Sequence, residues 1–478
     1  MICNYLNFMI LCCMMSELLK TTATYLAFGL IVISGHVADQ LAKIIHYKKY
    51  RKYFKYNGLS PMFTTFESFY IRRLYRRISD CWNRPISTSP SVNMEIMRRV
   101  SKDENKTFLI TGEKIKVLNF ASYNYLGLAD KQNFNTDEFI DQLIKNGDHL
   151  IASVPPILND NARLLENKIA KFLYKEECVI FQMGYGTNTL NISLIMNDAL
   201  ILSDEKNHTS IINGLKITNG LVVIYKHNNF KDLEKKLKFH IAQGQPLTHR
   251  AWNKIFVVLE GLFSMEGSIP DLNKLILLKE KYKFYIYLDE AHSFGCLGKT
   301  GRGICELLDV NFDKIDIIMG TFTKTFNGYG GFIASTKNII DFLRVKSPFL
   351  HFSDNISPVV VNQIVINLDY IIKHPEMLKE LKEKTIYMRQ KLKQRRFIVL
   401  GNKNSPVIPL LISNPGKLGE FSRLCLEKGL AMVVVGYPAT PLLQARTRIC
   451  MSAAHTYDEI DKAIKIIDLI GTLLGIKR

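Results

Sequence analysis

The stretch FYIYLDEAHSFG, residues 284–295, reads as a short buried strand that is followed by Asp289 and His292. Other apolar runs alternate with helical patterns before it: VLNFAS (117–122), ECVIFQMG (177–184), ALILSD (199–204), LVVIYKHN (221–228) and KIFVVLEG (254–261). Strands of four to eight β-branched and aromatic residues, separated by helices, are typical of a mostly parallel sheet covered on both faces. The sequence therefore predicts an α/β fold.

This alternation begins near Thr111 and ends near Ser347, which predicts a large domain over residues 111–346. A long helical stretch then leads into a smaller α/β domain, 347–478, with strands near IVLG, VIPLLI and AMVVV and a final helix. Residues 61–110 mix aromatic and basic side chains and are expected to form an arm that packs on another subunit or covers a domain. Residues 1–60 are expected to attach the protein to a membrane.

The composition narrows the class of protein. Of 478 residues, 47% are hydrophobic and 22% charged, which excludes wholesale disorder and a transporter with many spans. The net charge is +19, but no zinc-finger spacing, RNP-like motif or glycine-arginine tract points to nucleic acid. Much of the excess charge lies between Lys43 and Arg77, behind an apolar segment, and favours a lipid surface. The nine scattered cysteines lack metal-like pairs and indicate a reducing compartment.

The apolar segment Thr21–Val37 has roughly 17 residues without a charge, near the lower limit for a membrane span. A cleaved signal peptide is disfavoured because no charged region precedes it, and a re-entrant pair and a buried core helix are the remaining alternatives. A positive cluster follows, which by the positive-inside tendency places the bulk of the protein in the cytosol. Its members are Lys43, Lys48, Lys49, Arg51, Lys52 and Lys55.

Three clusters follow predicted strands, where open α/β sheets bind their ligands. The first is Asp289 with His292. A carboxylate just past a strand could ligate a metal, serve as a Walker-type acid, or pair with a protonated ring nitrogen. In the last case the carboxylate keeps a pyridinium protonated, so that the ring withdraws electrons.

The second cluster is Lys324 in MGTFTKTFNGYGG, residues 319–331. Such a lysine can form an imine, and Thr321 and Thr323 can donate hydroxyls to a phosphate. A simple phosphate loop is an alternative, although the Walker spacing is absent. The other alternative is that Lys324 is an exposed lysine without a function.

The third cluster is FQMGYGTN, residues 181–188, which opens a helix whose Gly184, Tyr185 and Gly186 amides can cradle a phosphate. His208, after another strand, offers a flat ring, although a lone histidine is more often structural. In the order phosphate loop, histidine, Asp-x-x-His and Thr-x-Lys, these clusters together describe a pocket for pyridoxal phosphate.

These residues make the chain similar to the α-oxoamine synthases, fold-type I enzymes that use pyridoxal 5'-phosphate to condense an amino acid with an acyl-CoA. Within them it most resembles the cofactor-carrying, second long-chain-base type of serine palmitoyltransferase subunit. The resemblance runs nearly end to end and includes FESFYIRRLY, WNRPI, FASYNYLGLAD, EGLFSMEGSIPDL, YLDEAHSFGCLGKTGRG, GTFTKTF and VVVGYPATPLLQARTRICMSAAHT.

The resemblance implies a role for each site residue. Lys324 holds the cofactor as a Schiff base, Asp289 pairs with the pyridine nitrogen and His208 stacks on the ring. His292 and Ser264 reach the phenolic oxygen, and Gly184, Tyr185, Thr321 and Thr323 hold the phosphate. Arg446, with Arg448 second, binds the substrate carboxylate, and Pro438 to Pro441, including Thr440, form a mobile loop near the substrate.

The resemblance also implies the reaction and the partners. L-serine and palmitoyl-CoA or a similar acyl-CoA give 3-ketosphinganine, CoA and CO2, the first step of sphingolipid biosynthesis. A heterodimer with a paralogous first long-chain-base subunit is expected, at the endoplasmic reticulum membrane and facing the cytosol. The alternatives are another α-oxoamine synthase, such as a 5-aminolevulinate or 8-amino-7-oxononanoate synthase, and a catalytically weakened scaffolding subunit.

Several positions depart from the family pattern. Ile157 and Ala162 stand where a glycine and a histidine are usual, and Asp354 and Asn355 replace a Thr-Ser pair that reaches the partner's cofactor phosphate. Asn327 replaces a glycine. These changes lower the expected efficiency of catalysis and leave the cofactor pocket intact.

Overall fold

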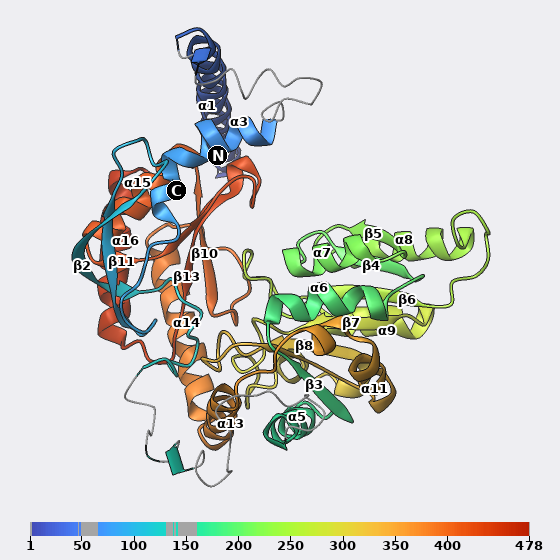
Figure 1. Ribbon diagram of the computed structural model, residues 1–478. Coiled ribbons are helices and arrows are strands. Elements are labelled where there is room, and N and C mark those ends of the chain that lie inside the picture. The colour runs from blue at the N-terminus through green and yellow to red at the C-terminus, as the bar shows by residue number, and fades with distance from the viewer. Residues whose placement is uncertain are drawn as a thin grey trace.

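Seven strands between residues 177 and 335 form the central sheet of the molecule, in the order β3-β9-β8-β7-β6-β4-β5 (Figure 1). β9 runs antiparallel to both of its neighbours, and the remaining neighbouring pairs are parallel. The predicted mostly parallel α/β sheet is confirmed. The strands are β3 (Glu177–Phe181), β4 (Leu200–Asp204), β5 (Leu221–Tyr225), β6 (Ile255–Glu260), β7 (Tyr285–Asp289), β8 (Ile317–Thr321) and β9 (Gly331–Ser335).

The computed structural model describes residues 2–45, 47–48, 66–130, 137, 140–141 and 160–477. Several residues that the sequence singles out lie outside these ranges: Lys49, Arg51, Lys52, Lys55 and Ile157.

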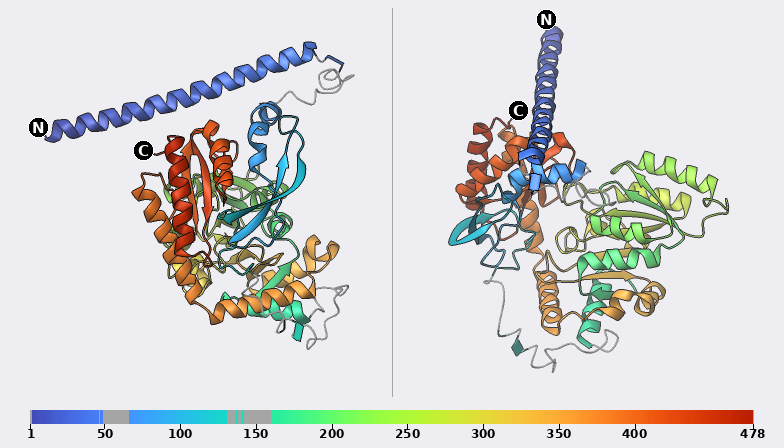
Figure 2. Two further views of the ribbon diagram at one scale, coloured as in Figure 1. Left: turned by 90° about the vertical axis from the view of Figure 1, so that its left-hand side faces the viewer. Right: turned by 45° about the horizontal axis from the view of Figure 1, so that its top comes forward.

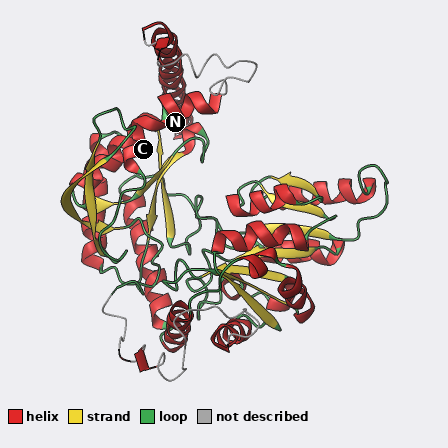
Figure 3. Cartoon of the chain, in the orientation of Figure 1, coloured by secondary structure: helices red, strands yellow, loops and turns green. Residues whose placement is uncertain are grey.

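Helices cover both faces of the central sheet (Figure 3). Because successive side chains of a strand point to opposite faces, Val257 and Val258 belong to different buried clusters. Val258 packs in the cluster with α6 (Gly184–Ile195), α7 (Thr209–Ile217) and α11 (Lys337–Lys346). Val257 packs in the cluster with α5 (Asp160–Phe172), α8 (Phe230–Gln243) and α9 (Leu272–Tyr282). Burial on both faces explains why these strands are almost continuously apolar.

Two further sheets of three strands each build the other part of the molecule. One has the order β1-β2-β11 and the other β10-β13-β12. Their strands are β1 (Asn93–Val100), β2 (Leu109–Asn119), β10 (Val407–Ser413), β11 (Leu430–Ala431), β12 (Val433–Val435) and β13 (Ala445–Cys450). The helices of this part are α13 (Pro358–Lys373), α14 (Glu376–Gln394), α15 (Pro415–Glu427) and α16 (Tyr457–Leu473), and α12 (Pro348–Phe352) precedes them.

The assignment of VLNFAS to the central sheet is wrong. This run ends β2, in which Leu118 pairs with Asn93 on one side and with Leu430 on the other. Its partners lie far away in the sequence, so its local pattern could not identify its sheet. The division of the chain at residues 110 and 346 stays a prediction, although β1 and β2 share a sheet with β11.

The N-terminal helix α1 (Ile2–Ile45) lies along one side of the body and extends past it (Figure 2). Its segment Thr21–Ala42, with a mean hydropathy of 1.4, is long and apolar enough to cross a membrane. Leu26, Leu30 and Ile33 on this segment are exposed. The helix meets the body near α3 (Phe66–Arg73), which is followed by the short 3-10 helix η1 (Tyr75–Cys81).

Residues from η1 to Trp82 cover the chain's own C-terminal part. The Trp82 Nε1 donates to the Val434 carbonyl at 2.8 Å, and Arg423 on α15 forms an ion pair with Asp80 at 2.8 Å. These contacts join this part of the chain to its C-terminal part, and the role of the whole arm stays a prediction.

Candidate active site

The carboxyl ends of the parallel strands meet at one edge of the central sheet, where a cavity of about 310 Å³ opens. The loops after several of the parallel strands deliver polar residues to it, because the chain turns from strand to loop at this edge. The cavity is lined by Met183, Gly184, Tyr185, Asn188, His208, Ser210, Glu260, Asp289, Ala291, His292, Met319, Thr321, Thr323 and Lys324. The structure thus gathers the predicted residues of the three clusters in one place, except Gly186, which is buried against Phe349.

Asp289, the last residue of β7, is buried and fully engaged on both oxygens. Its Oδ2 accepts from Asn188 Nδ2 at 2.8 Å, and its Oδ1 accepts from the Ala291 amide at 2.8 Å. Asn188 is fixed in turn by the Tyr287 hydroxyl, which donates to its Oδ1 at 2.7 Å. Asp289 is therefore a carboxylate held in a fixed position at the edge of the sheet.

Lys324 follows β8 and points its amine into the same cavity. Burial lowers the pKa of its amine to about 8, although the nearby Asp289 and Glu260 carboxyls act in the opposite direction. Its Nζ lies 5.8 Å from the centre of the Tyr123 ring. A lysine with this pKa is about one-tenth neutral, nucleophilic amine at pH 7, far more than a lysine with the ordinary pKa. The reading of Lys324 as a surface residue without a function does not fit this environment.

A cradle of small residues lies between the start of α6 and the end of β8. The Thr321 hydroxyl donates to the Gly330 carbonyl at 2.8 Å and lies 3.0 Å from the Thr323 hydroxyl. A Cβ on Gly184 would come within 2.5 Å of Thr321 Oγ1, so only glycine allows this approach. The free amides at the start of α6 face this region, and such amides bind anions.

The two histidines of the cavity are both held in their neutral form. His208 caps α7, because its Nδ1 accepts from the Ser210 amide at 3.2 Å, and burial lowers its pKa. His292 is buried with its Nδ1 2.9 Å from the Tyr125 hydroxyl. Burial and the neighbouring Lys324 hold the pKa of His292 well below its usual value. Each ring can therefore stack or exchange a hydrogen bond without adding charge.

The two arginines of β13 occupy different surroundings although both are buried. Arg446 donates to the Gln444 carbonyl at 2.8 Å, to the Gln444 side chain at 2.9 Å and to the Met265 carbonyl at 3.3 Å. It also lies 3.7 Å from Glu266. The hydrogen-bonding capacity of Arg446 is therefore largely used by Gln444, Met265 and Glu266.

Arg448 lies over the ring of Tyr123, with its Cζ 4.6 Å from the ring centre. Its Nε is buried and has no partner within the part of the chain that the structure describes. Tyr123 also contacts His292 edge to face, at 4.8 Å between ring centres, and the buried Ser264 lies near the Tyr123 hydroxyl. Arg448 is thus connected to the cavity through Tyr123.

Pro438 and Thr440 lie on the connection between β12 and β13, directly before the two arginines. Thr440 is buried, and its hydroxyl has no hydrogen-bond partner among the described residues. The predicted substrate loop and the predicted carboxylate-binding residues therefore belong to one continuous segment.

Sequence reasoning assigned no role to four residues that shape the site: Tyr123, Tyr125, Asn188 and Glu260. Asn188 is the last residue of the phosphate-loop motif FQMGYGTN, and both tyrosines lie in FASYNYLGLAD, so the motifs contained them. Glu260 ends β6 and is paired in register with Asp289. Burial and Asp289 raise the pKa of Glu260 well above its usual value, so it stands beside Asp289 as a neutral acid.

The departures from the family pattern that lie among the described residues do not disturb the cavity. Asn327 has a φ of 47°, a left-handed conformation that asparagine tolerates better than most residues with a side chain. Ala162 and Asp354 line a separate small hollow of about 20 Å³ with Gln182 and Asn355. Asp354 is therefore not beside the phosphate cradle of its own chain.

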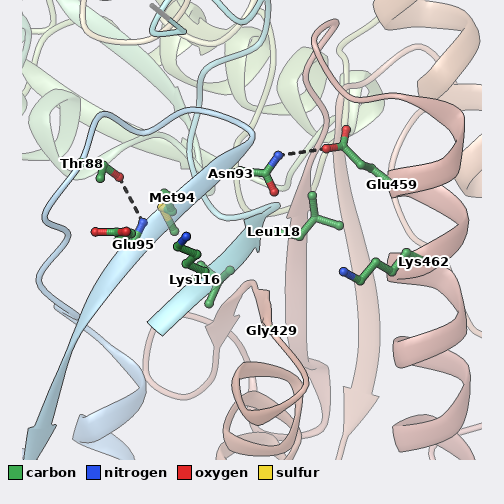
Figure 4. Close-up of a pocket in the computed structure, with 10 residues that line it drawn as sticks. Thr88, Asn93, Met94, Glu95, Lys116, Leu118, Gly429, Glu459 and Lys462 are labelled. Carbon is green, nitrogen blue, oxygen red and sulfur yellow. Dashed lines mark hydrogen bonds between the residues drawn. The ribbon is translucent and has the colours of Figure 1, made fainter. Parts of the chain in front are cut away.

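A larger hollow, of about 520 Å³, lies between β1, β2 and α16 (Figure 4). The Asn93 amide donates to Glu459 across one side of it at 3.0 Å, and Lys116 and Lys462 also line it. None of the predicted site residues lines it, so size alone does not identify the active site.

Comparisons with known proteins agree with this geometry. Residues 115–467 match the family of class I and II aminotransferases. Serine palmitoyltransferase 2 of Dictyostelium discoideum is 43% identical over 95% of this chain and 94% of the relative. Long chain base biosynthesis protein 2b of Arabidopsis thaliana is 42% identical over 96% and 95% of the two chains.

Among solved structures, serine palmitoyltransferase of Sphingomonas wittichii has the same fold, with a TM-score of 0.74 over 88% of this chain and 100% of that one, at 23% identity. The chain therefore belongs to the class I and II aminotransferase family and, within it, to the serine palmitoyltransferases.

Proposed function

We propose that this chain is the cofactor-carrying subunit of a serine palmitoyltransferase, which condenses L-serine with palmitoyl-CoA to give 3-ketosphinganine, CoA and CO2. The observation that carries the proposal is the convergence of Lys324 and Asp289 on one cavity beside the glycine and threonine cradle. The identity to relatives that are named serine palmitoyltransferases supports the choice of substrates.

The residues of the cavity fit pyridoxal 5'-phosphate. The amides of α6 with Thr321 and Thr323 suit a phosphate, and the missing Cβ of Gly184 lets the start of α6 approach the Thr321 hydroxyl closely. The fixed carboxylate of Asp289 suits a protonated ring nitrogen. Lys324 is placed to hold the aldehyde carbon covalently through its amine, and His208 lines the cavity with its flat ring. When bound, this cofactor withdraws electrons from the Cα of an attached amino acid.

The remaining chemistry belongs to the side chains. Two donors hold the Asp289 carboxylate in place, and the neutral Glu260 beside it adds no second charge. The amine of Lys324, once displaced by serine, is a base that can take or return the proton at Cα. Over the whole reaction the Cα–carboxylate bond of serine and the acyl C–S bond break and a Cα–acyl carbon bond forms. The carboxylate leaves as CO2 and the thiol of CoA leaves with a proton.

Arg448 is better placed than Arg446 to bind the carboxylate of serine. Its Nε is buried without a partner among the described residues, and it packs on Tyr123, whose ring contacts His292 of the cavity. Arg446 is held by Gln444, Met265 and Glu266. The proposed assignment therefore reverses the order that the resemblance implied.

The proposed setting is a heterodimer with a paralogous first long-chain-base subunit at the endoplasmic reticulum membrane, with the catalytic part in the cytosol. The apolar, exposed segment Thr21–Ala42 of α1 supports attachment to a membrane. The basic residues after it support a catalytic part that faces the cytosol. Phe352, 90% exposed, and Val345, 64% exposed, lie on α12 and α11 and offer an apolar surface to a partner.

The test is to purify the full chain with its partner and to record the visible absorption of the lysine-bound cofactor before and after serine is added. We expect a band that shifts with serine and that is lost in Lys324→Ala. Lys299→Ala, which removes an exposed lysine from a nearby loop, is the matched control and should keep the band. A wild-type protein without a band, or a Lys324→Ala protein with one, would contradict the proposal.

A further inference from the structure

The connection that carries Pro438–Pro441 is held at its base by residues from the N-terminal arm. The Tyr70 hydroxyl on α3 donates to the Tyr437 carbonyl at 2.5 Å, and the two rings meet edge to face at 4.9 Å. Trp82 holds the Val434 carbonyl three residues earlier, at 2.8 Å. One short segment therefore fixes both the end of β12 and the residue that precedes Pro438.

This hydrogen bond matters because the loop offers few alternatives. Two of its residues, Pro438 and Pro441, lack an amide donor. The backbone bonds that the structure shows within it run from Thr440 to Gly436, at 3.3 Å, and from Gln444 to Pro441, at 2.8 Å. Tyr70 is buried, and burial raises the pKa of its hydroxyl to about 12, so it remains a donor at any physiological pH. Loss of this donor would leave the Tyr437 carbonyl poorly satisfied.

The same face of α3 is docked on the C-terminal turns of α1. The Arg73 guanidinium donates twice to Asp39 Oδ1, at 2.7 and 2.5 Å, and the rings of His36 and Phe69 stack at 3.9 Å. A Cβ on Gly35 would come within 2.8 Å of the Phe69 ring, so the helix and the ring are in close contact. These contacts lie inside the apolar segment Thr21–Ala42. A continuous chain of contacts thus leads from the apolar helix through α3 to the loop.

We infer that Tyr70 is a positioning residue for the loop at Pro438–Pro441, and that α3 links the position of α1 to this loop. The inference rests on the proposed function, in which the loop borders the serine site. The loop enters β13 directly before Arg446 and Arg448, so a base that is held in place also limits how far the loop can move from the arginines.

The decisive variant is Tyr70→Phe in the full chain with its partner, because it removes one hydroxyl and keeps the ring. Hydrogen–deuterium exchange of peptides over residues 436–444 should become faster by about fivefold or more. The KM for serine should rise severalfold, while kcat, the thermal midpoint and the absorption of the bound cofactor stay near wild type. The matched control is Tyr387→Phe, whose hydroxyl donates to Asp461 at 2.9 Å, far from the loop in sequence. It should leave both the exchange and the KM unchanged.

A second variant, Asp39→Asn, tests the link to α1. It weakens the bond to Arg73, and exchange should become faster over residues 66–82 and 436–444 together. Faster exchange of residues 66–82 alone would overturn the link, and a Tyr70→Phe loop that exchanges like wild type would overturn the role of Tyr70. The exchange measurement needs neither serine nor cofactor. A failure of the proposed function would therefore appear as a missing absorption band, with the exchange result unaffected.

Discussion

The two sides of the cavity are built in different ways. On the side of the central sheet, Asp289 and Lys324 follow adjacent parallel strands, and local sequence places each of them. On the other side, Tyr123 follows β2, Ser264 follows β6 and Arg448 lies on β13, so three distant segments must meet. Asp289 is held by a side chain of α6 and a backbone amide, whereas Arg448 packs on an aromatic ring and keeps a free donor.

This difference indicates that the two sides of the cavity bind different molecules. The sheet side offers fixed charge and an amide cradle, which suits a cofactor that stays bound. The β13 side offers an arginine with one unpartnered donor next to a loop, which suits a substrate that enters and leaves. Changes on the sheet side should therefore alter the cofactor or kcat, and changes on the β13 side should alter the binding of serine.

The largest effect should come from Asp289→Asn on the sheet side. The amide keeps the shape but removes the charge that would stabilise a protonated ring nitrogen, so kcat should fall on the order of a hundredfold or more. Steady-state rates with serine and palmitoyl-CoA measure this, and the absorption band of the bound cofactor reports whether the site still loads. Asp369→Asn, which removes a carboxylate paired with Lys168 at the surface, is the control. A kcat at the wild-type level would show that the ring nitrogen does not need this charge.

The pair Arg448→Gln and Arg446→Gln tests the β13 side. Arg448→Gln should raise the KM for serine about tenfold or more and leave the cofactor band in place, because hydrogen bonds between charged groups are strong. Arg446→Gln should act mainly on stability, by about 1–3 kcal/mol, because it leaves the buried neighbours of Arg446 without a donor. Serine titrations and thermal melts separate the two outcomes. A larger KM effect for Arg446→Gln would restore the order that the resemblance implied.

The pH dependence of cofactor loading is a further test of the sheet side of the cavity. Only the neutral amine of Lys324 can attack an aldehyde, and its pKa is about 8. The rate at which the apoprotein takes up the cofactor should therefore rise about tenfold per pH unit below 8 and level off above it. Stopped-flow absorbance at several pH values measures it. Because Asp289 raises the pKa of Lys324, Asp289→Asn should move the plateau to lower pH. A rate that is still rising above pH 10 would indicate an ordinary, exposed lysine.

The smallest effect is expected at Asn327, in the turn that follows Lys324. Asn327→Gly should change the free energy of unfolding by no more than about 1 kcal/mol, since glycine relieves the left-handed backbone but makes the unfolded chain more flexible. Asn327→Val should destabilise more, because a β-branched residue does not tolerate this conformation. Denaturant titrations compare them. Equal losses for both variants would mean that the side chain, and not the backbone, matters here.

Much of the sheet side could be predicted because its signals are local. A strand followed by Asp-Glu-Ala-His, and another followed by Thr-Phe-Thr-Lys, carry both the element and the reactive group in a dozen residues. The strand β9 and the Arg-rich β13 were not predicted, since neither has a long apolar run beside it. The run VLNFAS resembled the strands of the central sheet but joined another sheet. The sequence of one strand does not determine which distant strand it pairs with.

The sequence by itself determined the α/β class, the order of the strand-end motifs and an apolar N-terminal helix, because periodicity and residue type act over short distances along the chain. The tertiary structure alone decided which tyrosine stacks against which arginine, which of two buried arginines keeps a free donor, and that Tyr70 reaches the carbonyl of Tyr437. Those choices depend on how segments hundreds of residues apart pack together. The free energy of that packing belongs to pairs of segments and to no segment alone.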